Sequence, residues 1–168
     1  MKTSFLFLIS VFSISLFTVS CKKDSKTVPI QIMLTDNPAA YDSVNVRIKG
    51  IQVKIDKDDS GWISIKSKDT MINLLDLRNG TTTLIAQDNV PDGVLKEVRF
   101  ILGSDSYVVV DGVRHDLETP SAESSGLKVK IDKKLAETLN SFTLDFDADL
   151  SIKEENGNYK LMPVIKLK

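Results

Sequence analysis

The stretch VNVRIKGIQVKI, residues 44–55, decides the fold class of this chain. Its apolar residues occupy every second position up to Ile48, and after Gly50 the alternation resumes one position out of phase at Ile51. A period of two is typical of a β-strand that buries one face, and a one-residue slip at a glycine predicts a β-bulge. We therefore expect one long, half-buried strand with a bulge at Gly50.

Alternation of the same kind continues on both sides of this stretch. It predicts strands at residues 28–34, 62–65, 71–77 and 94–102, the last with Val98, Phe100 and Leu102 on one face. Residues 78–90 lack a clear period and are expected to hold a helical turn. Polar turns separate these segments, so the pattern indicates a run of hairpins rather than strand–helix–strand units.

Two dipeptides predict the register of a hairpin each, because Asp111-Gly112 and Asn156-Gly157 both suit a two-residue type I′ turn. The first turn predicts these facing pairs: Val110 with Val113, and Val108 with His115. The second predicts four: Ile152 with Leu161, Leu150 with Pro163, Ala148 with Ile165, and Phe146 with Leu167. One face of the second ribbon would then be wholly apolar, which agrees with its turn. Pro163 cannot donate to a ladder, so the last strand is expected at a sheet edge.

These observations predict an all-β fold, namely a two-sheet antiparallel β-sandwich of about nine strands that spans residues 28–168. The length that remains after the N-terminal segment is typical of one domain. We therefore expect a single globular domain.

The first residues predict a bacterial lipoprotein signal peptide over residues 1–20. Lys2 precedes an apolar run at residues 5–17, and small residues precede Cys21, the only cysteine of the chain. A short apolar run with these flanks is typical of a secretory signal rather than a membrane span. We expect Cys21 to be lipidated and residues 21–27 to form the lipidated cysteine and a short tether, so that the lipid is the membrane attachment.

The charge of the chain is nearly balanced, with 22 basic and 23 acidic residues. Nucleic acid is therefore not an expected partner, because its binding calls for a basic stripe. With Cys21 lipidated, no thiol is left for a disulfide, and stability is expected to come from the core.

His115 is the only histidine, and Asp116 follows it directly. Adjacent residues on a strand point to opposite faces, so Asp116 is not expected to orient the imidazole as in a catalytic triad. The sequence also shows no phosphate loop, zinc spacing or cofactor fingerprint. We expect no enzyme activity and no cofactor, apart from the calcium hypothesis that follows.

Asp145, Asp147 and Asp149 would share one strand face under simple alternation. Together with the loop residue Asp36 they suggest a calcium site at Asp36, Asp145 and Asp147, since calcium prefers carboxylate oxygens. Residues two apart on a strand are about 6.6 Å apart, so a shared ion would need help from a loop. The simpler explanation is a ladder of exposed ion pairs, in which Asp147 faces Lys166 and Asp145 faces Lys168.

Two further features suggest ligand binding. Residues 119–126 form a hydroxyl-rich stretch between strands, and its candidate ligand-binding residues are Ser121, Ser124 and Ser125. Trp62, the only tryptophan, would stack on a sugar ring if it were exposed. The alternatives are a plain polar connection for the loop and a half-buried core position for Trp62.

Several short motifs occur in a familiar order: LTDNPA (34–39), YDSVNV (41–46), GW (61–62), LLDL (74–77), VPDG (90–93), VRF (98–100), PS (120–121), SGLK (125–128), LDFDA (144–148) and YKLMPV (159–164). Over about residues 29–166 they resemble the DUF4382-type domain of unknown function, which is frequent in lipoproteins of Gram-negative bacteria. The resemblance implies a lipid-anchored, extracytoplasmic, β-rich domain, and it brings no catalytic residue with it.

Together these observations predict a lipid-anchored lipoprotein of the outer membrane, with its surface or periplasmic face left open. Its expected role is that of a non-catalytic β-sandwich module that binds a surface glycan or a protein ligand. The alternative is a structural or assembly component of the cell envelope or of a surface appendage, and a calcium-stabilised module is the weaker third hypothesis.

Overall fold

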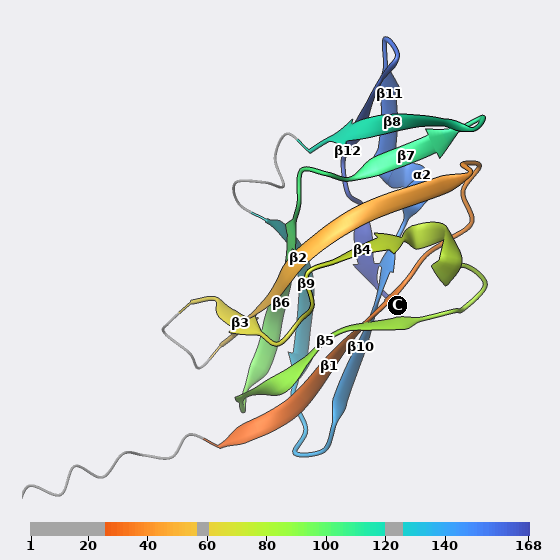
Figure 1. The fold of residues 1–168 in the computed structure, drawn as a ribbon. Helices are drawn as coiled ribbons and strands as arrows, with labels where there is room; N and C mark the ends of the chain where they lie inside the picture. The colour runs from red at the N-terminus through yellow and green to blue at the C-terminus, as the bar shows by residue number, and fades with distance from the viewer. Residues whose placement is uncertain (1–25, 57–60, 120–125) are drawn as a thin grey trace, which may run out of the picture.

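A computed structural model describes residues 26–56, 61–119 and 126–168 of the chain (Figure 1). The predicted signal peptide, Cys21, most of the tether, and Ser121, Ser124 and Ser125 lie outside the described residues. The described strands are β1 (Thr27–Thr35), β2 (Ser43–Ile55), β3 (Ile63–Ile65), β4 (Thr70–Asn73), β5 (Thr83–Pro91), β6 (Val94–Leu102), β7 (Tyr107–Val110), β8 (Val113–Glu118), β9 (Leu127–Lys134), β10 (Asn140–Phe146), β11 (Ile152–Glu155), β12 (Asn158–Leu161) and β13 (Ile165–Leu167). A 3-10 turn, η1 (Leu74–Leu77), and a four-residue helix, α2 (Ala148–Ser151), complete the set.

The strands form two sheets that enclose one core. A four-stranded sheet has the order β13-β10-β1-β5, and a nine-stranded sheet has the order β11-β12-β8-β7-β2-β6-β9 with β3 and β4 also paired to β2. Alternate residues of β1 and of β2 point into the same buried cluster, as the period of two predicts. Phe100 of β6 and Phe146 of β10 meet edge to face in this core, with ring centroids 6.4 Å apart.

The long strand and its bulge are confirmed. β2 runs through both halves of the alternation, and its pairing with β6 shifts between Ile48 and Gly50. This long strand also pairs with β3, β4 and β7, so it is the centre of the larger sheet (Figure 1).

The all-β class is confirmed, but the purely antiparallel arrangement and the number of about nine strands are wrong. Thirteen strands are described, several of them three or four residues long. β1 and β10 pair in parallel, and so do β8 and β12. Turn signals report only strands that are neighbours in the sequence, whereas β1 and β10 are joined by a long path with no local signature.

Two local predictions between residues 71 and 90 are also wrong. The predicted strand 71–77 ends at Asn73, whose side chain accepts a hydrogen bond from the Leu75 amide at 3.3 Å and starts η1. The predicted helical turn within 78–90 is instead β5. A register shift opposite Ile32 and Met33 buries both Ile85 and Ala86, which hides the period of two.

The two type I′ turns are confirmed by the positive φ angles of Asp111, Gly112, Asn156 and Gly157. The first hairpin has the predicted register throughout. The second keeps it only up to the pair of Ile152 and Leu161. Beyond that pair α2 interrupts the ribbon, Phe146 faces Ile165 instead of Leu167, and Leu150 is 58% exposed. β13 lies at a sheet edge as expected, and Pro163 lies in the connection before it.

We predict that Phe100→Ala lowers the free energy of unfolding by about 3–5 kcal/mol, because the ring is fully buried between the sheets. Leu150→Ala is the matched control and should change it by less than about 0.5 kcal/mol, since this leucine is exposed. Urea denaturation followed by circular dichroism measures both. A large loss of unfolding free energy in Leu150→Ala would mean that Leu150 is buried. It would then favour the continuous apolar ribbon predicted from the sequence over α2.

Candidate functional site

Trp62 lies directly before β3 and is half-buried. The guanidinium carbon of Arg99 lies 3.8 Å from the centroid of its ring, and the Nζ atom of Lys128 lies 5.9 Å from it. Both distances are in the range of cation–π attraction. The predicted ligand residue Trp62 is therefore part of a cationic cluster on the outside of the larger sheet.

A row of polar side chains crosses four strands beside Trp62. In the strand register, Ser64 of β3 faces Gln52 of β2, Gln52 faces Arg99 of β6, and Arg99 faces Lys128 of β9. Hydrogen bonds join part of it: Arg99 Nη1 donates to Gln52 Oε1 at 3.3 Å, and Gln52 Nε2 donates to Ser64 Oγ at 3.1 Å. We call Trp62, Ser64, Gln52, Arg99 and Lys128 the tryptophan row.

Gly126 holds the aliphatic part of Arg99 close to the backbone. Its φ is +67°, and a Cβ at this position would lie 2.7 Å from Arg99 Cγ and 2.9 Å from the carbonyl oxygen of Phe100. The Nε atom of Arg99 is buried and has no hydrogen-bond partner among the described residues. The guanidinium is thus held by its stack on Trp62 and by Gln52, which keeps it in a defined place on the sheet surface.

The tryptophan row brings an aromatic ring, an amide, a hydroxyl and two cations together on one surface of the sheet. The neighbouring outward row adds Lys54 of β2, Glu97 of β6 and Lys130 of β9. Sequence reasoning found Trp62 but missed Arg99 and Lys128. The alternation marks Arg99 as an outward position between Val98 and Phe100, but only the strand register places it against Trp62.

The three predicted metal residues do come together, where β1 and β10 end. Asp36, Asp145 and Asp147 are 2%, 3% and 7% exposed. Asp36 Oδ1 accepts a hydrogen bond from the Ala148 amide at 2.9 Å, and Asp147 Oδ2 accepts one from Asn37 Nδ2 at 3.1 Å. Asp147 Oδ1 also accepts from the Leu150 amide at 3.0 Å and caps α2.

The prediction of an exposed ladder of ion pairs is therefore wrong. Asp145 faces Lys166 rather than Lys168, with Asp145 Oδ2 and Lys166 Nζ 3.5 Å apart, and its carboxylate is buried. Asp149 is the exposed member of the series, because α2 breaks the alternation after Phe146. In the part of the chain that the structure describes, no group of three His, Cys, Asp or Glu residues is placed to hold a metal ion. Calcium binding stays a prediction without geometric support.

Burial raises the pKa of the Asp36 carboxyl to about 6, and the negative charges of Asp145 and Asp147 add to the rise. Hydrogen bonds from the amides of Ala148 and Asn37 oppose it. Asp36 Oδ2 and Asp145 Oδ1 are buried without a hydrogen-bond partner among the described residues. An oxygen without a hydrogen-bond donor does not stabilise the charged form, which agrees with the raised pKa of Asp36.

His115 is placed as the sequence predicts. It faces Val108 across the hairpin, and its ring contacts that of Tyr159 at a tilt of 43° with the centroids 4.6 Å apart. Asp116 points to the other face, where its Oδ1 lies 3.4 Å from Arg114 Nη2. This arrangement does not orient the imidazole for general-base catalysis.

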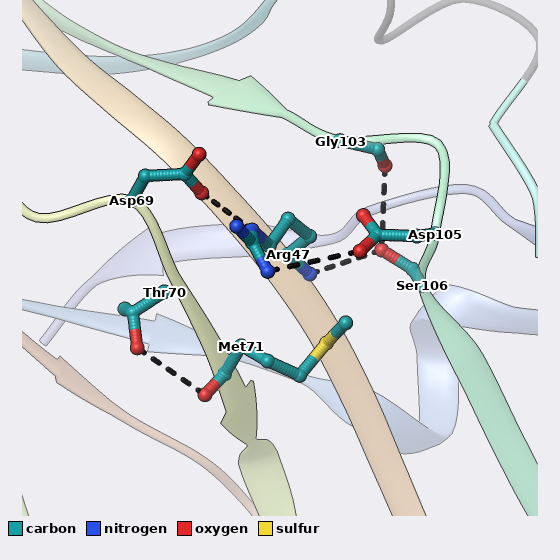
Figure 2. A network of polar contacts seen from close by, with 7 residues as sticks. All are labelled: Arg47, Asp69, Thr70, Met71, Gly103, Asp105 and Ser106. Carbon is teal, nitrogen blue, oxygen red and sulfur yellow. Dashed lines mark hydrogen bonds and ion pairs between the residues drawn. The ribbon is translucent and has the colours of Figure 1, made fainter.

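Arg47 organises a second polar network on β2, which Figure 2 shows. Its Nε atom pairs with Asp69, which lowers the pKa of that carboxyl, and its Nη1 lies 3.7 Å from Asp105 Oδ2. The Arg47 amide donates to Ser106 Oγ at 3.0 Å, and Ser106 Oγ donates to the Gly103 carbonyl at 3.4 Å. The network joins the segment before β4 and the turn after β6 to β2, which is a structural role.

A hollow of about 460 Å³ lies between β4 and β5. Ile72, Leu84, Ile85 and Ala86 line it together with Lys66 and Lys68, and its lining holds no carboxylate, histidine or cysteine. The Lys66 carbonyl accepts a hydrogen bond from the Gln87 amide at 3.0 Å, so this segment already covers part of the β5 edge. The lining also includes the hydroxyl groups of Ser67, Thr70 and Thr83.

Among the described residues no helix is both long and apolar enough to cross a membrane.

Comparisons with known proteins return a family and distant solved structures. A family model described as a domain of unknown function, DUF4382, matches residues 27–163. No curated protein matches the chain. A crystal structure of a Bacteroides fragilis protein, proposed by its description to act in cell adhesion, aligns with a TM-score of 0.38 and 12% identity. The alignment covers 84% of this chain and spans 45% of that one.

We predict that the contribution of Asp36 to the stability of the folded protein falls as the pH rises through the interval from 3.8 to about 6. Within it the folded state keeps a proton on Asp36 that the unfolded chain releases, so stabilisation is complete below the interval and lost above it. The total change is about 3 kcal/mol. Urea denaturation at several pH values measures it.

Asp36→Asn removes this titration and keeps an acceptor for the Ala148 amide, so the difference in free energy of unfolding between this variant and the wild type should change with pH across the same interval. Asp149→Asn is the matched control, because Asp149 is exposed in the same segment. Equal pH dependence of the wild type and Asp36→Asn would contradict the assignment.

Proposed function

The chain belongs to the DUF4382 family of domains of unknown function, and we propose that it is a lipid-anchored, non-catalytic module that binds a glycan through the tryptophan row. The observation that supports a glycan as the ligand is the stack of Trp62 on Arg99 with Lys128 beside it. An indole face binds the apolar face of a sugar ring, while guanidinium and amide groups bind its hydroxyls.

The proposed anchorage rests on the N-terminal sequence. Cys21 follows an apolar run and small residues, and Lys22 rather than an acidic residue comes next. We propose the outer membrane as the location, because the sequence lacks the aspartate after the cysteine that retains lipoproteins in the inner membrane.

The non-catalytic part of the proposal rests on the surroundings of the single histidine. The ring of His115 contacts that of Tyr159, and Asp116 pairs with Arg114 on the other face of the strand. The tryptophan row itself offers an indole, an amide, a hydroxyl and two cations, which are groups that bind and orient a ligand.

Trp62 is the only tryptophan, so the intrinsic fluorescence of the protein reports on this site alone. We predict that oligosaccharides selected on a glycan array change this emission in a saturable way. Trp62→Ala should weaken binding roughly tenfold or more, because the stacking surface is lost, and isothermal titration calorimetry measures it since this variant lacks the fluorophore. Tyr159→Ala is the matched aromatic control and should bind like the wild type. A blank array, or unchanged affinity of Trp62→Ala, would overturn the proposal.

A second candidate function is assembly in the envelope through the edge of the four-stranded sheet. The observation that favours it is β13, a three-residue edge strand preceded by Val164, which is 39% exposed. Open edges pair with strands of other chains.

Under this second function, chemical cross-linking of intact cells should trap a species larger than the monomer. Val164→Lys should reduce its yield, because a lysine at an edge opposes pairing, whereas Val113→Lys on a distant turn should not. Finding the monomer alone would argue against assembly.

A further inference from the structure

Three segments meet at the end of the domain where the chain enters the fold. The Asp92 amide donates to the Lys26 carbonyl at 2.9 Å, and the Leu135 amide donates to the Gly93 carbonyl at 2.9 Å. The side chain of Lys26 pairs with Glu137, which lies in the connection between β9 and β10. We call residues 26, 92–93, 133–139 and 168 the tether end, and Figure 1 shows the start of β1 beside the loop from β9 to β10.

The proposed lipid anchor limits how far this end lies from a bilayer, so the inference rests on the proposed function. Five residue steps separate Cys21 from Lys26, and they span at most about 18 Å whatever their conformation. The hairpin tips of β7–β8 and β11–β12 lie at the opposite end of the domain (Figure 1). Of the two ends, the tether end is therefore the one held close to the lipid.

The side chains of the tether end suit a lipid surface. Leu139 is 51% exposed at the loop between β9 and β10. Lys133 and Lys134 are exposed at the end of β9, and together with Lys168 they line one hollow of about 350 Å³. An exposed apolar side chain beside lysines is the combination that binds the interface of an anionic bilayer.

The carboxylates of this end are already engaged. Glu137 pairs with Lys26, and Asp132 pairs with Lys96 at 3.2 Å and with Lys130 at 3.0 Å. Asp92 also has an interaction partner. Lys133 and Lys134 are exposed and take part in none of these ion pairs.

We propose that the tether end is a second, peripheral membrane contact, in which Leu139 enters the headgroup region and Lys133, Lys134 and Lys168 bind the phosphates of anionic lipids. The domain then stands with a fixed orientation on the bilayer, with the β7–β8 and β11–β12 hairpins pointing away. The lipid chain holds the protein at the membrane, and this contact decides which way it faces.

The test uses the mature lipidated protein in vesicles of phosphatidylethanolamine and phosphatidylglycerol. Because Cys21 is the only cysteine and carries the lipid, Leu139→Cys provides a single thiol for an environment-sensitive fluorophore. Val113→Cys is the matched control, an exposed apolar position on the distant β7–β8 turn. A quencher placed in the lipid should reduce the emission of the Leu139→Cys label roughly twofold more than that of the control.

Two variations identify the cause of the signal. Exchange of phosphatidylglycerol for phosphatidylcholine, or the pair Lys133→Glu and Lys134→Glu, should remove the difference between the two labels. Equal quenching of the two labels on vesicle-bound protein would overturn the orienting contact and leave the lipid anchor intact. Failure of the protein to sediment with the vesicles would overturn the anchor, and this inference with it.

Discussion

The hydrogen bond from the Ala148 amide to the buried Asp36 carboxylate is the contact on which the rest of the structure depends. It joins the end of β1 to the point where the chain leaves β10, and the two strands run parallel up to this point. Here the chain passes from the four-stranded sheet through α2 to β11 and β12 of the larger sheet, and then returns as β13. Asp147 stabilises the same crossing by capping α2. A parallel pair lacks a tight connecting turn, so its ends need such side-chain contacts to set its register.

This crossing has a physical consequence, because it buries three carboxylates together. Part of their cost is offset by amide donors, and the remainder appears as the raised pKa of Asp36. These contacts define the path of the chain between the sheets, and the buried charge lowers the free energy of unfolding at neutral pH. The motifs LTDNPA and LDFDA contribute the residues that meet here, which gives two of the motifs of the family resemblance a structural role.

The tryptophan row follows from the same alternation that builds the core. Val53, Val98 and Val129 point inward on three adjacent strands, so the residues next to them point outward and line up across the sheet. A bulged and twisted sheet holds such a row more rigidly than a loop does. The tryptophan row and the tether end occupy different parts of the domain, so the proposed glycan contact and the proposed membrane contact are compatible with each other.

The sequence by itself determined the all-β class, the long strand with its bulge at Gly50, and the type I′ turn at Asp111 and Gly112, because each depends on residues that are close in the chain. It also singled out Trp62, Asp36, Asp145 and Asp147 by residue type. Only the tertiary structure decided the parallel pairing of β1 with β10, the replacement of an apolar ribbon by α2, and the position of Arg99 against Trp62. The reason is that hydrophobic periodicity and turn chemistry are local, whereas parallel pairing, register across distant strands and the burial of a carboxylate are set by contacts between segments far apart in the chain.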